Sequence, residues 1–403
     1  MMGTISGSST ANVVTTGSFT IPMMKSIGYK PHFAGAVEAT ASTGGQLMPP
    51  IMGAAAFIMA EFTNLPYVQI AIAAALPALL YYVCVGMSTH FEAKRYGLGG
   101  LPREQLPRAG AVIKNAGFLV LPIGAIVWLL LSGYTPVKAA LYAIGLAILV
   151  SWMRKATRMG IKDIVEALDA GARTAAVVAV ACAAAGITVG MVTLTGAGLK
   201  LGYGIVDLAQ GMLLPTLFFT MIASLVLGVG VPTTANYIIT ATIAAPAVVQ
   251  LGVPLLAAHM FAFYFGILAD ITPPVALAAY AASGVARSNP MQTGLTATRL
   301  GISAFLIPYI FVTNPALLLV NTPPLEALWV ALSSLIGIVG LSAAVIGFWR
   351  TELKAWERAI LLAGALGLMT PGILTDFVGV FVLVLVWFTQ QRRLHAATPV
   401  LRT

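Results

Sequence analysis

Two short segments of this sequence carry hydroxyl and amide side chains at the same spacing, and both could bind a cation. Ser9-Thr10-Ala11-Asn12 is matched by Thr233-Thr234-Ala235-Asn236, at an offset of 224 residues (Asn12 to Asn236). Their side chains supply neutral oxygen ligands, which suit a hard cation such as Na⁺ where a helix end adds free carbonyl groups. Helices that restart after Ala11 and after Ala235 would also present free amides and positive dipole ends, which suit a carboxylate. An anionic solute flanked by two cations is therefore the electrostatically favoured occupant.

Both segments belong to a longer internal repeat in which all matched residues are separated by the same number of positions. Pro22 is matched by Pro246 at the same offset, and the pair Pro49-Pro50 is matched by Pro273-Pro274. Chance similarity between small residues would not keep register over this distance. The repeat therefore indicates a duplicated structural unit.

Each repeat predicts a helix that is broken at membrane depth. A Pro-Pro pair removes two backbone donors and forces the preceding residue out of helical geometry. We therefore expect breaks near Gly44-Gly45 and near Asp270-Ile271-Thr272. Broken backbone survives at that depth only where protein or a wet cavity surrounds it, and two such breaks in corresponding halves are typical of a transporter binding site. In the second half an apolar arm over 213–227 predicts a re-entrant hairpin, with the polar segment at its tip.

The candidate cation ligands are the polar residues of the two tips together with residues of the two breaks. Glycine is useful at a break because the backbone must approach the ion closely and adopt positive φ. Serine and threonine in membrane helices often bond back to the carbonyl four residues earlier, but the duplication favours a ligand role here. The two asparagines could be direct ligands or braces within the hairpins. The candidates are Ser9, Thr10, Asn12, Thr43, Gly44 and Gly45 in the first half and Thr233, Thr234, Asn236, Asp270 and Thr272 in the second; Ser9, Thr10, Thr233 and Thr234 are also the candidate substrate contacts.

Two carboxylates lie in the predicted broken helices. A carboxylate at membrane depth is a functional candidate by default, and Asp270 falls in the second break. Its counterpart in the first half is Gln46, so the two sites would differ in charge. Glu38 could pair with Lys30 or His32 near a surface, which would be a structural role.

An enzyme is not supported by the motifs. A zinc site built from His32, Glu38, His259 and Asp270 lacks the usual ligand spacings, and the two histidines do not align in the repeat. No Gly-x-Ser-x-Gly motif indicates a hydrolase. We therefore expect no cofactor and no metal beyond sodium. The formal charge of +9 does not indicate a nucleic-acid partner, because the basic residues lie in short loops between apolar stretches.

The composition requires a lipid environment. The 403 residues are 59% hydrophobic and 9% charged, whereas a soluble domain is about one quarter charged. Apolar stretches are long enough for helices to cross a bilayer, which takes about 20 residues, and they lack the alternation of barrel strands. The sequence therefore predicts an all-α polytopic membrane protein in contact with membrane lipid. The clearest stretches are 68–85, 118–134, 137–152, 175–194, 302–320 and 328–348.

The basic residues predict the orientation of the chain. One cluster lies within 94–114 and a second within 154–162, and two predicted crossings separate them. Both clusters therefore fall on one side of the membrane, which the positive-inside rule makes cytoplasmic.

The repeat divides the chain into five parts. Only eight residues precede the first motif, so we expect the first hairpin to lack its incoming arm and the chain to be the C-terminal portion of a longer permease. The alternative is a short start whose hairpin never forms. Residues 160–171 are amphipathic and predict an interfacial arm helix. The predicted parts are a partial first hairpin and broken helix (1–62), scaffold spans with the arm helix (63–173), the second repeat with a complete hairpin and broken helix (174–287), a scaffold span (288–322), and C-terminal extension spans with a basic tail (323–403).

This combination of motifs resembles the large membrane subunit of TRAP (tripartite ATP-independent periplasmic) transporters. The resemblance rests on residues 7–12, 22–24 and 44–53 in the first copy and on 228–236 and 269–274 in the second. The form Gly-Gly-Gln-Leu-Met-Pro-Pro at 44–50 and the extra C-terminal spans are similar to the TAXI subgroup, in which the small and large membrane subunits are often fused.

The resemblance implies an inverted-repeat elevator transporter, in which paired hairpins and broken helices carry substrate and ions across a fixed scaffold. It also implies a periplasmic substrate-binding protein, coupling to a cation gradient that is usually of sodium, and a place in the cytoplasmic (inner) membrane of a bacterium or archaeon. Substrates are mostly small organic acids, and the TAXI subgroup is associated with dicarboxylates such as glutamate and 2-oxoglutarate. The family's cation-site regions map onto 9–12 with 43–45 and onto 233–236 with 269–272. A small membrane subunit, or a missing N-terminal portion of the same permease, is a further expected partner.

Two other functions remain open at this point. The chain could be a stand-alone carboxylate/cation symporter of related architecture, which would transport without a soluble partner. It could also be a nonconducting membrane assembly subunit.

Overall fold

The chain folds into helices throughout the part that the structure describes. The computed structural model describes residues 3–4, 7–102, 104, 106, 109–320, 322–370 and 372–397. Arg103 and Arg108 of the first basic cluster, and the end of the basic tail at 398–403, lie outside the described residues. The α-helices are α2 (Ser9–Ile27), α3 (Pro31–Gly44), α4 (Ala54–Thr63), α5 (Tyr67–Arg95), α6 (Ala109–Ala116), α7 (Leu121–Leu131), α8 (Pro136–Ser151), α9 (Ile161–Leu194), α10 (Ala197–Leu208), α11 (Leu213–Leu227), α12 (Thr233–Ile243), α13 (Ala245–Val249), α14 (Leu255–Leu268), α15 (Leu277–Ala286), α16 (Pro290–Leu300), α17 (Ile302–Thr313), α18 (Pro324–Ile346), α19 (Ala355–Met369) and α20 (Ile373–Ala397).

Helix length and composition confirm the prediction of an all-α polytopic membrane protein. Within the described residues, five helical segments are long and apolar enough to cross a bilayer. The predicted stretches 118–134 and 137–152 form the shorter helices α7 and α8, because a 3-10 helix at Gly117–Val120 precedes α7 and a turn at 132–135 separates it from α8. The five segments are Tyr67–Arg95, Ile161–Leu194, Pro290–Thr313, Pro324–Ile346 and Ile373–Leu394.

The internal repeat is visible in the helix boundaries. Helices α3 and α14 are both 14 residues long, and their first and last residues differ by the same offset of 224 that relates the motifs. Each is followed by a non-helical stretch with a cis bond inside its proline pair, and then by a 10-residue helix, α4 or α15. The two predicted helix breaks are therefore confirmed.

Both polar segments open a helix, two or three residues earlier than expected. Helix α2 begins at Ser9, where the side chain of Ser8 accepts a hydrogen bond from the amide of Ala11. Helix α12 begins at Thr233, directly after Pro232. The expectation that the helices restart after Ala11 and Ala235 was wrong, because a serine cap and a proline each start a helix at the residue that follows.

The second tip lies between two short helices. Helix α11 has 15 residues and α12 has 11, which is less than the roughly 20 needed to span a bilayer. They pack against each other and against the first arm of the broken helix, α14. This arrangement has the dimensions of the predicted re-entrant hairpin.

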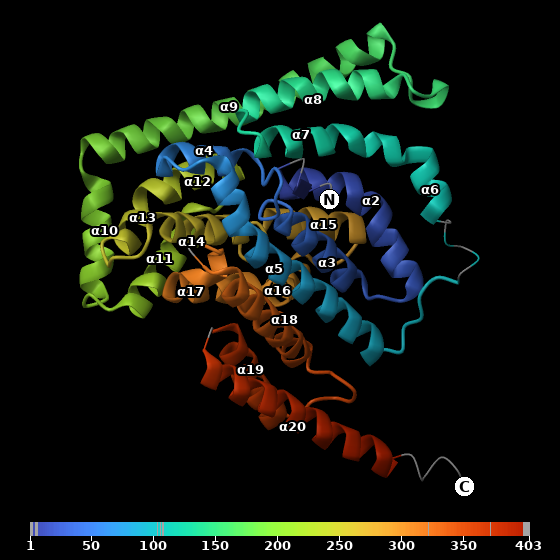
Figure 1. Cartoon of the computed structure of the whole chain (residues 1–403), viewed down its shortest axis with the longest axis vertical. Coiled ribbons are helices and arrows are strands. Elements are labelled where there is room, and N and C mark those ends of the chain that lie inside the picture. Colours follow the sequence, from blue (N-terminus) through green and yellow to red (C-terminus); the bar gives the residue numbers. More distant parts are fainter. Residues whose placement is uncertain are drawn as a thin grey trace.

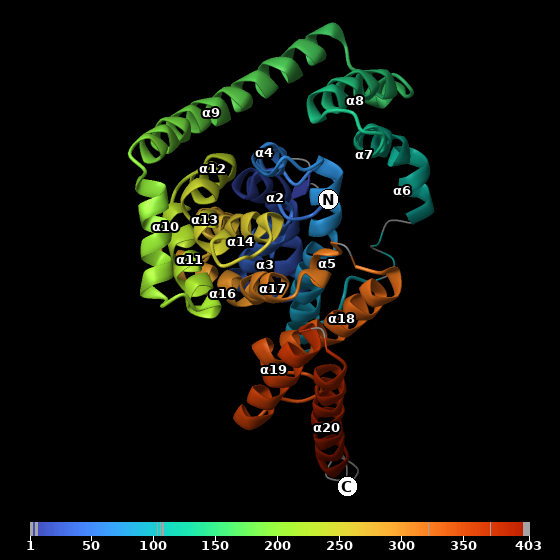
Figure 2. The same ribbon diagram turned by 60° about the vertical axis from the view of Figure 1, so that its left-hand side comes forward.

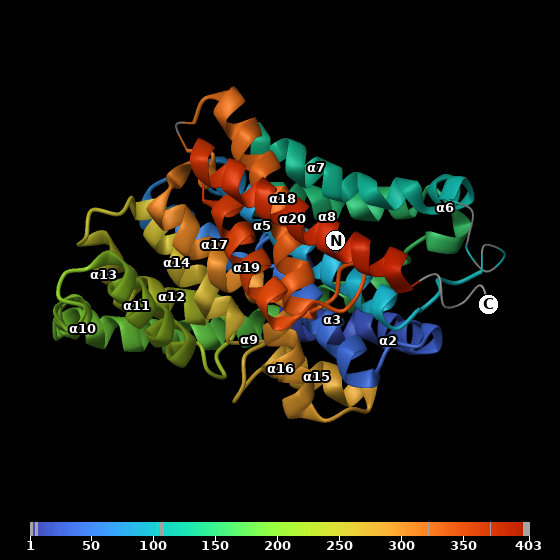
Figure 3. The same ribbon diagram turned by 90° about the horizontal axis from the view of Figure 1, so that it is seen from below.

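The two halves interlock at the centre of the molecule. Helices α15 and α16 of the second half pack against α3, and α15 also packs against α2. Figure 3 shows α15 and α16 beside α2 and α3 at one edge of the body, with α18, α19 and α20 lying across it. The two sets of candidate residues are consequently held in one body.

Helices α6 to α10 form a peripheral belt. Figures 1 and 2 both show α9 along one edge, separated from the central helices over much of its length. The predicted arm helix at 160–171 and the predicted span at 175–194 form this single 34-residue helix, since no proline or paired glycine interrupts them. The predicted boundary between residues 173 and 174 therefore falls inside a continuous helix.

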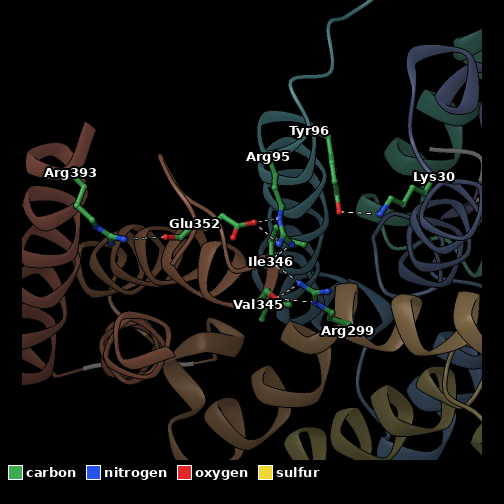
Figure 4. Close-up of polar contacts among 8 residues, drawn as sticks. All are labelled: Lys30, Arg95, Tyr96, Arg299, Val345, Ile346, Glu352 and Arg393. Atoms are coloured by element: carbon green, nitrogen blue, oxygen red, sulfur yellow. Dashed lines mark hydrogen bonds and ion pairs between the residues drawn. The ribbon is translucent and has the colours of Figure 1, made fainter. Parts of the chain in front are cut away.

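Arginine side chains attach the C-terminal extension to the repeats. Arg299 on α16 donates to the carbonyls of Val345 and Ile346 at the end of α18, with its closest contact at 2.5 Å. Arg95 on α5 forms an ion pair with Glu352 at 2.7 Å and also approaches the Ile346 carbonyl (Figure 4). Cations at a helix C-terminus complement its negative dipole end. These contacts fix α18 against α5 and α16.

Candidate functional site

A hydrogen bond between the two halves lies at the centre of the candidate site. Ser9 on the first tip donates from Oγ to Oδ2 of Asp270 in the second break, at 2.5 Å. Both side chains are buried, with exposed fractions of 1% and 8%. The sequence analysis placed these residues in separate sites, one in each half. The structure instead brings the first tip to the carboxylate of the second break.

The two asparagines brace their tips in the same way. Asn12 donates from Nδ2 to Oγ of Ser42 on α3, at 2.9 Å. Asn236 donates from Nδ2 to the carbonyl of Gly266 on α14, at 2.7 Å. Ser42 and Gly266 are equivalent in the repeat, since the partners are 30 residues apart in both pairs. Each bond therefore ties a tip to the helix that precedes its break.

Each asparagine also keeps a buried oxygen without a hydrogen bond from any described residue. The Oδ1 atoms of Asn12 and Asn236 lack a partner in the part of the chain that the structure describes, although the exposed fractions of the residues are 6% and 2%. Leaving such an acceptor unpaired costs about 1 to 3 kcal/mol. A cation bound at each of these oxygens would remove this cost. The alternatives of brace and ligand are thus compatible, because the amide nitrogen serves one role and leaves the oxygen for the other.

Further buried oxygens lie at the first break. Thr43 is fully buried at the end of α3, and its Oγ1 has no hydrogen-bond partner among the described residues. Gln46 is buried two residues after the helix and lies within hydrogen-bonding reach of the Asp270 carboxyl group. An ion of the Na⁺ type binds neutral oxygen ligands. Thr43 and Gln46 therefore supply neutral oxygens of the kind that a monovalent cation binds.

Helix α11 contributes two hydroxyl groups that the sequence analysis missed. Thr220 and Ser224 are fully buried, and neither hydroxyl oxygen has a partner. With Thr216 they follow a spacing of four residues, which places them on one face of the helix. The sequence could have indicated these residues, because hydroxyl side chains at a spacing of four are unusual in an otherwise apolar arm.

The glycines at the first break are required by close packing. A Cβ atom on Gly44 would overlap the ring of Tyr81, and one on Gly45 would overlap the backbone of Gly3. Gly45 has φ of −57°, and Gly44 lies within the helix. These contacts are with Tyr81 and Gly3, and the expected approach of the backbone to an ion stays a prediction. The expected positive φ was wrong, because the chain continues in a right-handed turn.

The remaining candidates have weaker connections to the site. Thr234 is buried, Thr10 and Thr233 are half-buried, and within the described residues none of the three hydroxyls forms a hydrogen bond. Thr272 donates its hydroxyl proton back to the carbonyl of Leu268 at 2.7 Å, as threonine commonly does in helices. The Thr272 hydroxyl has given its proton to this carbonyl, but its oxygen lone pairs, like those of Thr10, Thr233 and Thr234, remain available to a cation.

Glu38 occupies a different environment from the one expected. It is buried with an exposed fraction of 7%, and its carboxyl group contacts the hydroxyls of Thr16, Thr20 and Ser42. The expected pairing with Lys30 or His32 was wrong. Eight residues along a helix separate Lys30 from Glu38 by about 12 Å, and Lys30 bonds to the Tyr96 hydroxyl instead.

The residues considered for a zinc enzyme do not converge. His259 bonds through Nδ1 to the Tyr237 hydroxyl at 2.7 Å, and His32 lies in the first turn of α3. Across the described ranges, no group of three or more His, Cys, Asp or Glu side chains could hold a metal ion.

The sequence is similar to a known transporter family over most of its length. Residues 1–325 match the family described as "Tripartite ATP-independent periplasmic transporter, DctM component". Residues 327–380, which include α19 and most of α18, match a domain of unknown function (DUF3394). The boundary between the two matches falls at the start of α18.

Two related sequences are similar to this chain over part of their length. The "Putative TRAP transporter large permease protein" of Haemophilus influenzae is 25% identical over 297 residues, or 71% of this chain and 67% of the relative. The "Ectoine/5-hydroxyectoine TRAP transporter large permease protein UehC" of Ruegeria pomeroyi is 32% identical over 158 residues, or 37% of this chain and 36% of the relative. The chain thus spans about two thirds of the first relative and about one third of the second.

Proposed function

The chain belongs to the DctM-component family of tripartite ATP-independent periplasmic transporters, and on that premise we propose that it couples Na⁺ entry to the uptake of a small organic acid. As a member it is a large permease component, a transport protein and not an enzyme. The coupling ion, the substrate and the partners are our proposals.

The observation that carries the proposal is the pair of unsatisfied asparagine oxygens. Asn12 and Asn236 stand at equivalent positions, each braced through Nδ2 and each with a buried, unpaired Oδ1 beside a helix break. Neutral oxygens held by a rigid frame suit a weakly charged cation such as Na⁺. Two such positions support two cation sites, one in each half.

A carboxylate lies between the two halves. Asp270 is the counterpart of Gln46 in the repeat, and it contacts both Gln46 and Ser9 of the first half. Asp270 accepts the Ser9 hydroxyl in this conformation. A cation that binds Asp270 would turn the Ser9 oxygen toward the ion, because the hydroxyl can exchange donation for acceptance. Ion binding in one half would thereby act on the tip of the other.

An organic acid is the substrate class that fits the tips. Helices α2 and α12 begin at Ser9 and Thr233, so both polar segments lie at helix N-termini, where free amides and the helix dipole favour an anion. The side chains of Thr10, Thr233 and Thr234 offer additional hydroxyl donors. The name of the Ruegeria pomeroyi relative gives ectoine and 5-hydroxyectoine. For this chain we propose a carboxylate and leave the rest of the molecule open, with dicarboxylates of the TAXI type among the candidates.

The partners follow from the family description, which names a tripartite and periplasmic transporter. We propose that a periplasmic binding protein delivers the acid and that a small membrane subunit, or a fused equivalent, completes the permease in the inner membrane. The tips and broken helices would move together as an inverted-repeat elevator against the long helices. The helices of the peripheral belt, α6 to α10, are exposed along much of their length and offer a surface for lipid or for the small subunit.

Reconstitution of the complete permease tests the proposal. Proteoliposomes with the binding protein outside should accumulate a labelled carboxylate when Na⁺ is higher outside, and should not do so with K⁺ or choline in its place. Uptake without the binding protein would favour the stand-alone symporter. Uptake that ignores the sodium gradient would contradict the coupling, and the absence of uptake from the complete assembly would favour a nonconducting subunit.

A further inference from the structure

The two asparagine braces use acceptors of different chemistry. Asn236 donates from Nδ2 to the backbone carbonyl of Gly266 at 2.7 Å, and a carbonyl oxygen can only accept a hydrogen bond. Asn12 donates from Nδ2 to the hydroxyl of Ser42 at 2.9 Å, and a hydroxyl can both accept and donate. The acceptor in the second half therefore fixes the orientation of the asparagine amide by itself, whereas the acceptor in the first half does not.

The reversed orientation of the Asn12 amide would be unfavourable for a cation. If Ser42 donated its proton to Asn12, the amide would turn over, and Oδ1 would face Ser42. The Nδ2 group would then occupy the position of the buried, unpaired oxygen, and its hydrogens would repel a positive ion. The first cation site thus requires a group that takes the Ser42 proton away from Asn12.

Glu38 lies where this group is needed. Ser42 donates from Oγ to Oε1 of Glu38, one helical turn earlier on α3, at 3.3 Å. Among the described residues the Ser42 proton has no other acceptor, and a serine has only one hydroxyl proton. Both residues are buried, with exposed fractions of 7% for Glu38 and 1% for Ser42. The bond to Glu38 leaves only oxygen lone pairs on Ser42 for Asn12.

The carboxyl group of Glu38 is held by the helix that carries Asn12. Thr16 donates to Oε1 and Thr20 donates to Oε2, each at 2.5 Å, and both threonines follow Asn12 on α2. A Cβ atom on Gly17 would lie 3.1 Å from Cγ of Glu38, so this glycine lets α2 approach the side chain closely. Glu38 is therefore fixed relative to both Ser42 and the first tip.

The second half lacks this arrangement together with the need for it. A Cβ atom on Gly266 would lie 3.0 Å from Nδ2 of Asn236, so the glycine gives the amide access to the carbonyl. The half with a hydroxyl acceptor has a carboxyl group beside it, and the half with a carbonyl acceptor has none. The equivalents of Gly17, Thr20, Glu38 and Ser42 at the offset of 224 are Ala241, Ala244, Ala262 and Gly266.

We propose that Glu38 is a positioning residue of the first cation site: it accepts the Ser42 proton and thereby keeps Oδ1 of Asn12 turned toward the ion. Glu38 acts through Ser42 and is not itself a ligand. This role rests on the proposed function, because the ion is the cation assigned there to Asn12. It has a specific consequence, since removal of Glu38 should weaken sodium binding only while residue 42 is a serine.

Sodium binding to a set of variants of the purified full chain tests this role. Radioactive Na⁺ is bound in a scintillation proximity assay, and Asn12→Ala identifies the component of binding that belongs to the first site. In Glu38→Ala the half-saturating sodium concentration of this component should rise about tenfold, the factor that corresponds to one ordinary hydrogen bond. Ser42→Gly introduces the residue found in the second half, so Glu38→Ala/Ser42→Gly should bind within about twofold of Ser42→Gly alone.

The outcomes separate positioning from a purely structural role. If Glu38 only held α2 against α3, its loss would weaken binding by the same factor with serine or glycine at residue 42, and that result would overturn the proposal. Unchanged binding in Glu38→Ala would overturn it too. Glu61→Ala is the control for loss of an acidic residue, because Glu61 is exposed on α4, and it should bind like the wild type. If the wild type binds no sodium, or Asn12→Ala removes none, the cation assignment itself fails and the positioning role fails with it.

Two further variants keep the test decisive if a substitution prevents folding. Glu38→Met keeps the length of the side chain without a carboxyl oxygen, and it should weaken sodium binding as Glu38→Ala does. Ser42→Ala removes the hydroxyl through which Glu38 acts, so Glu38→Met should cause no further loss in that background. Binding like the wild type in Glu38→Met, or a further loss in Glu38→Met/Ser42→Ala, would contradict the role of Glu38.

Discussion

Replacing Asn236 by alanine separates the two roles that the structure assigns to this side chain. The change removes the 2.7 Å bond from Nδ2 to the Gly266 carbonyl and deletes the buried, unpaired Oδ1. The buried carbonyl of Gly266 would then lack a hydrogen-bond partner, which costs about 1 to 3 kcal/mol of folding stability. If Oδ1 contributes a similar amount to cation binding, the sodium concentration for half-maximal uptake should rise about tenfold to hundredfold, since 1.4 kcal/mol corresponds to a factor of ten.

Two further variants make the Asn236 prediction specific. Asn236→Asp keeps an oxygen at the ligand position and loses the donor, so it should lose thermal stability without Na⁺ but retain sodium-dependent uptake better than the alanine variant. Thr195→Val is the matched control, because Thr195 is exposed just after α9 and its hydroxyl bonds only to nearby backbone, the carbonyls of Met191 and Val192 and the amide of Ala197. The assay is uptake of a labelled carboxylate by the reconstituted assembly over a sodium series. Equal sodium dependence in Asn236→Ala and Thr195→Val would refute the ligand role and leave only the brace.

Three other substitutions probe the site independently. Ser9→Ala leaves the buried Asp270 without its hydroxyl donor, and thermal unfolding should show a loss of about 1 to 3 kcal/mol; an unchanged unfolding temperature would show that the 2.5 Å contact contributes nothing. Gly44→Ala should lower the folded yield in size-exclusion chromatography, because the added carbon overlaps a buried tyrosine ring, whereas Gly86→Ala has open space and should be tolerated. Equal yields would contradict the close packing at the break. Thr272→Val should raise the half-saturating sodium concentration, since the Thr272 hydroxyl donates its proton to the Leu268 carbonyl and leaves its oxygen lone pairs for the ion, and an unchanged sodium dependence would remove Thr272 as a ligand.

The broken helices could be predicted from the sequence because their cause is local. A proline pair acts on the residues beside it, so the ends of α3 and α14 were located to within a residue or two. The starts of α2 and α12 were predicted too late, because Ser8 and Pro232 lie outside the repeated four-residue segment and still determine where the helix begins.

Contacts between the halves could not be predicted from the repeat. The bond from Ser9 to Asp270 joins residues 261 positions apart, and it depends on how α15 and α16 pack against the first half. Internal symmetry relates Ser9 to Thr233 and says nothing about contacts across the repeat. Glu38 was misjudged for a similar reason, because its partners lie on α2 and not among its neighbours in sequence.

Direct binding of radioactive sodium to the purified chain tests the cation sites without any partner protein. Scintillation proximity measurements should show saturable binding that unlabelled Na⁺ displaces and choline does not. The double variant Asn12→Ala/Asn236→Ala should lose most of this binding while it still elutes as a folded species. Binding that is undiminished in the double variant, or absent from the wild type, would contradict the assignment of cation sites to the two helix breaks.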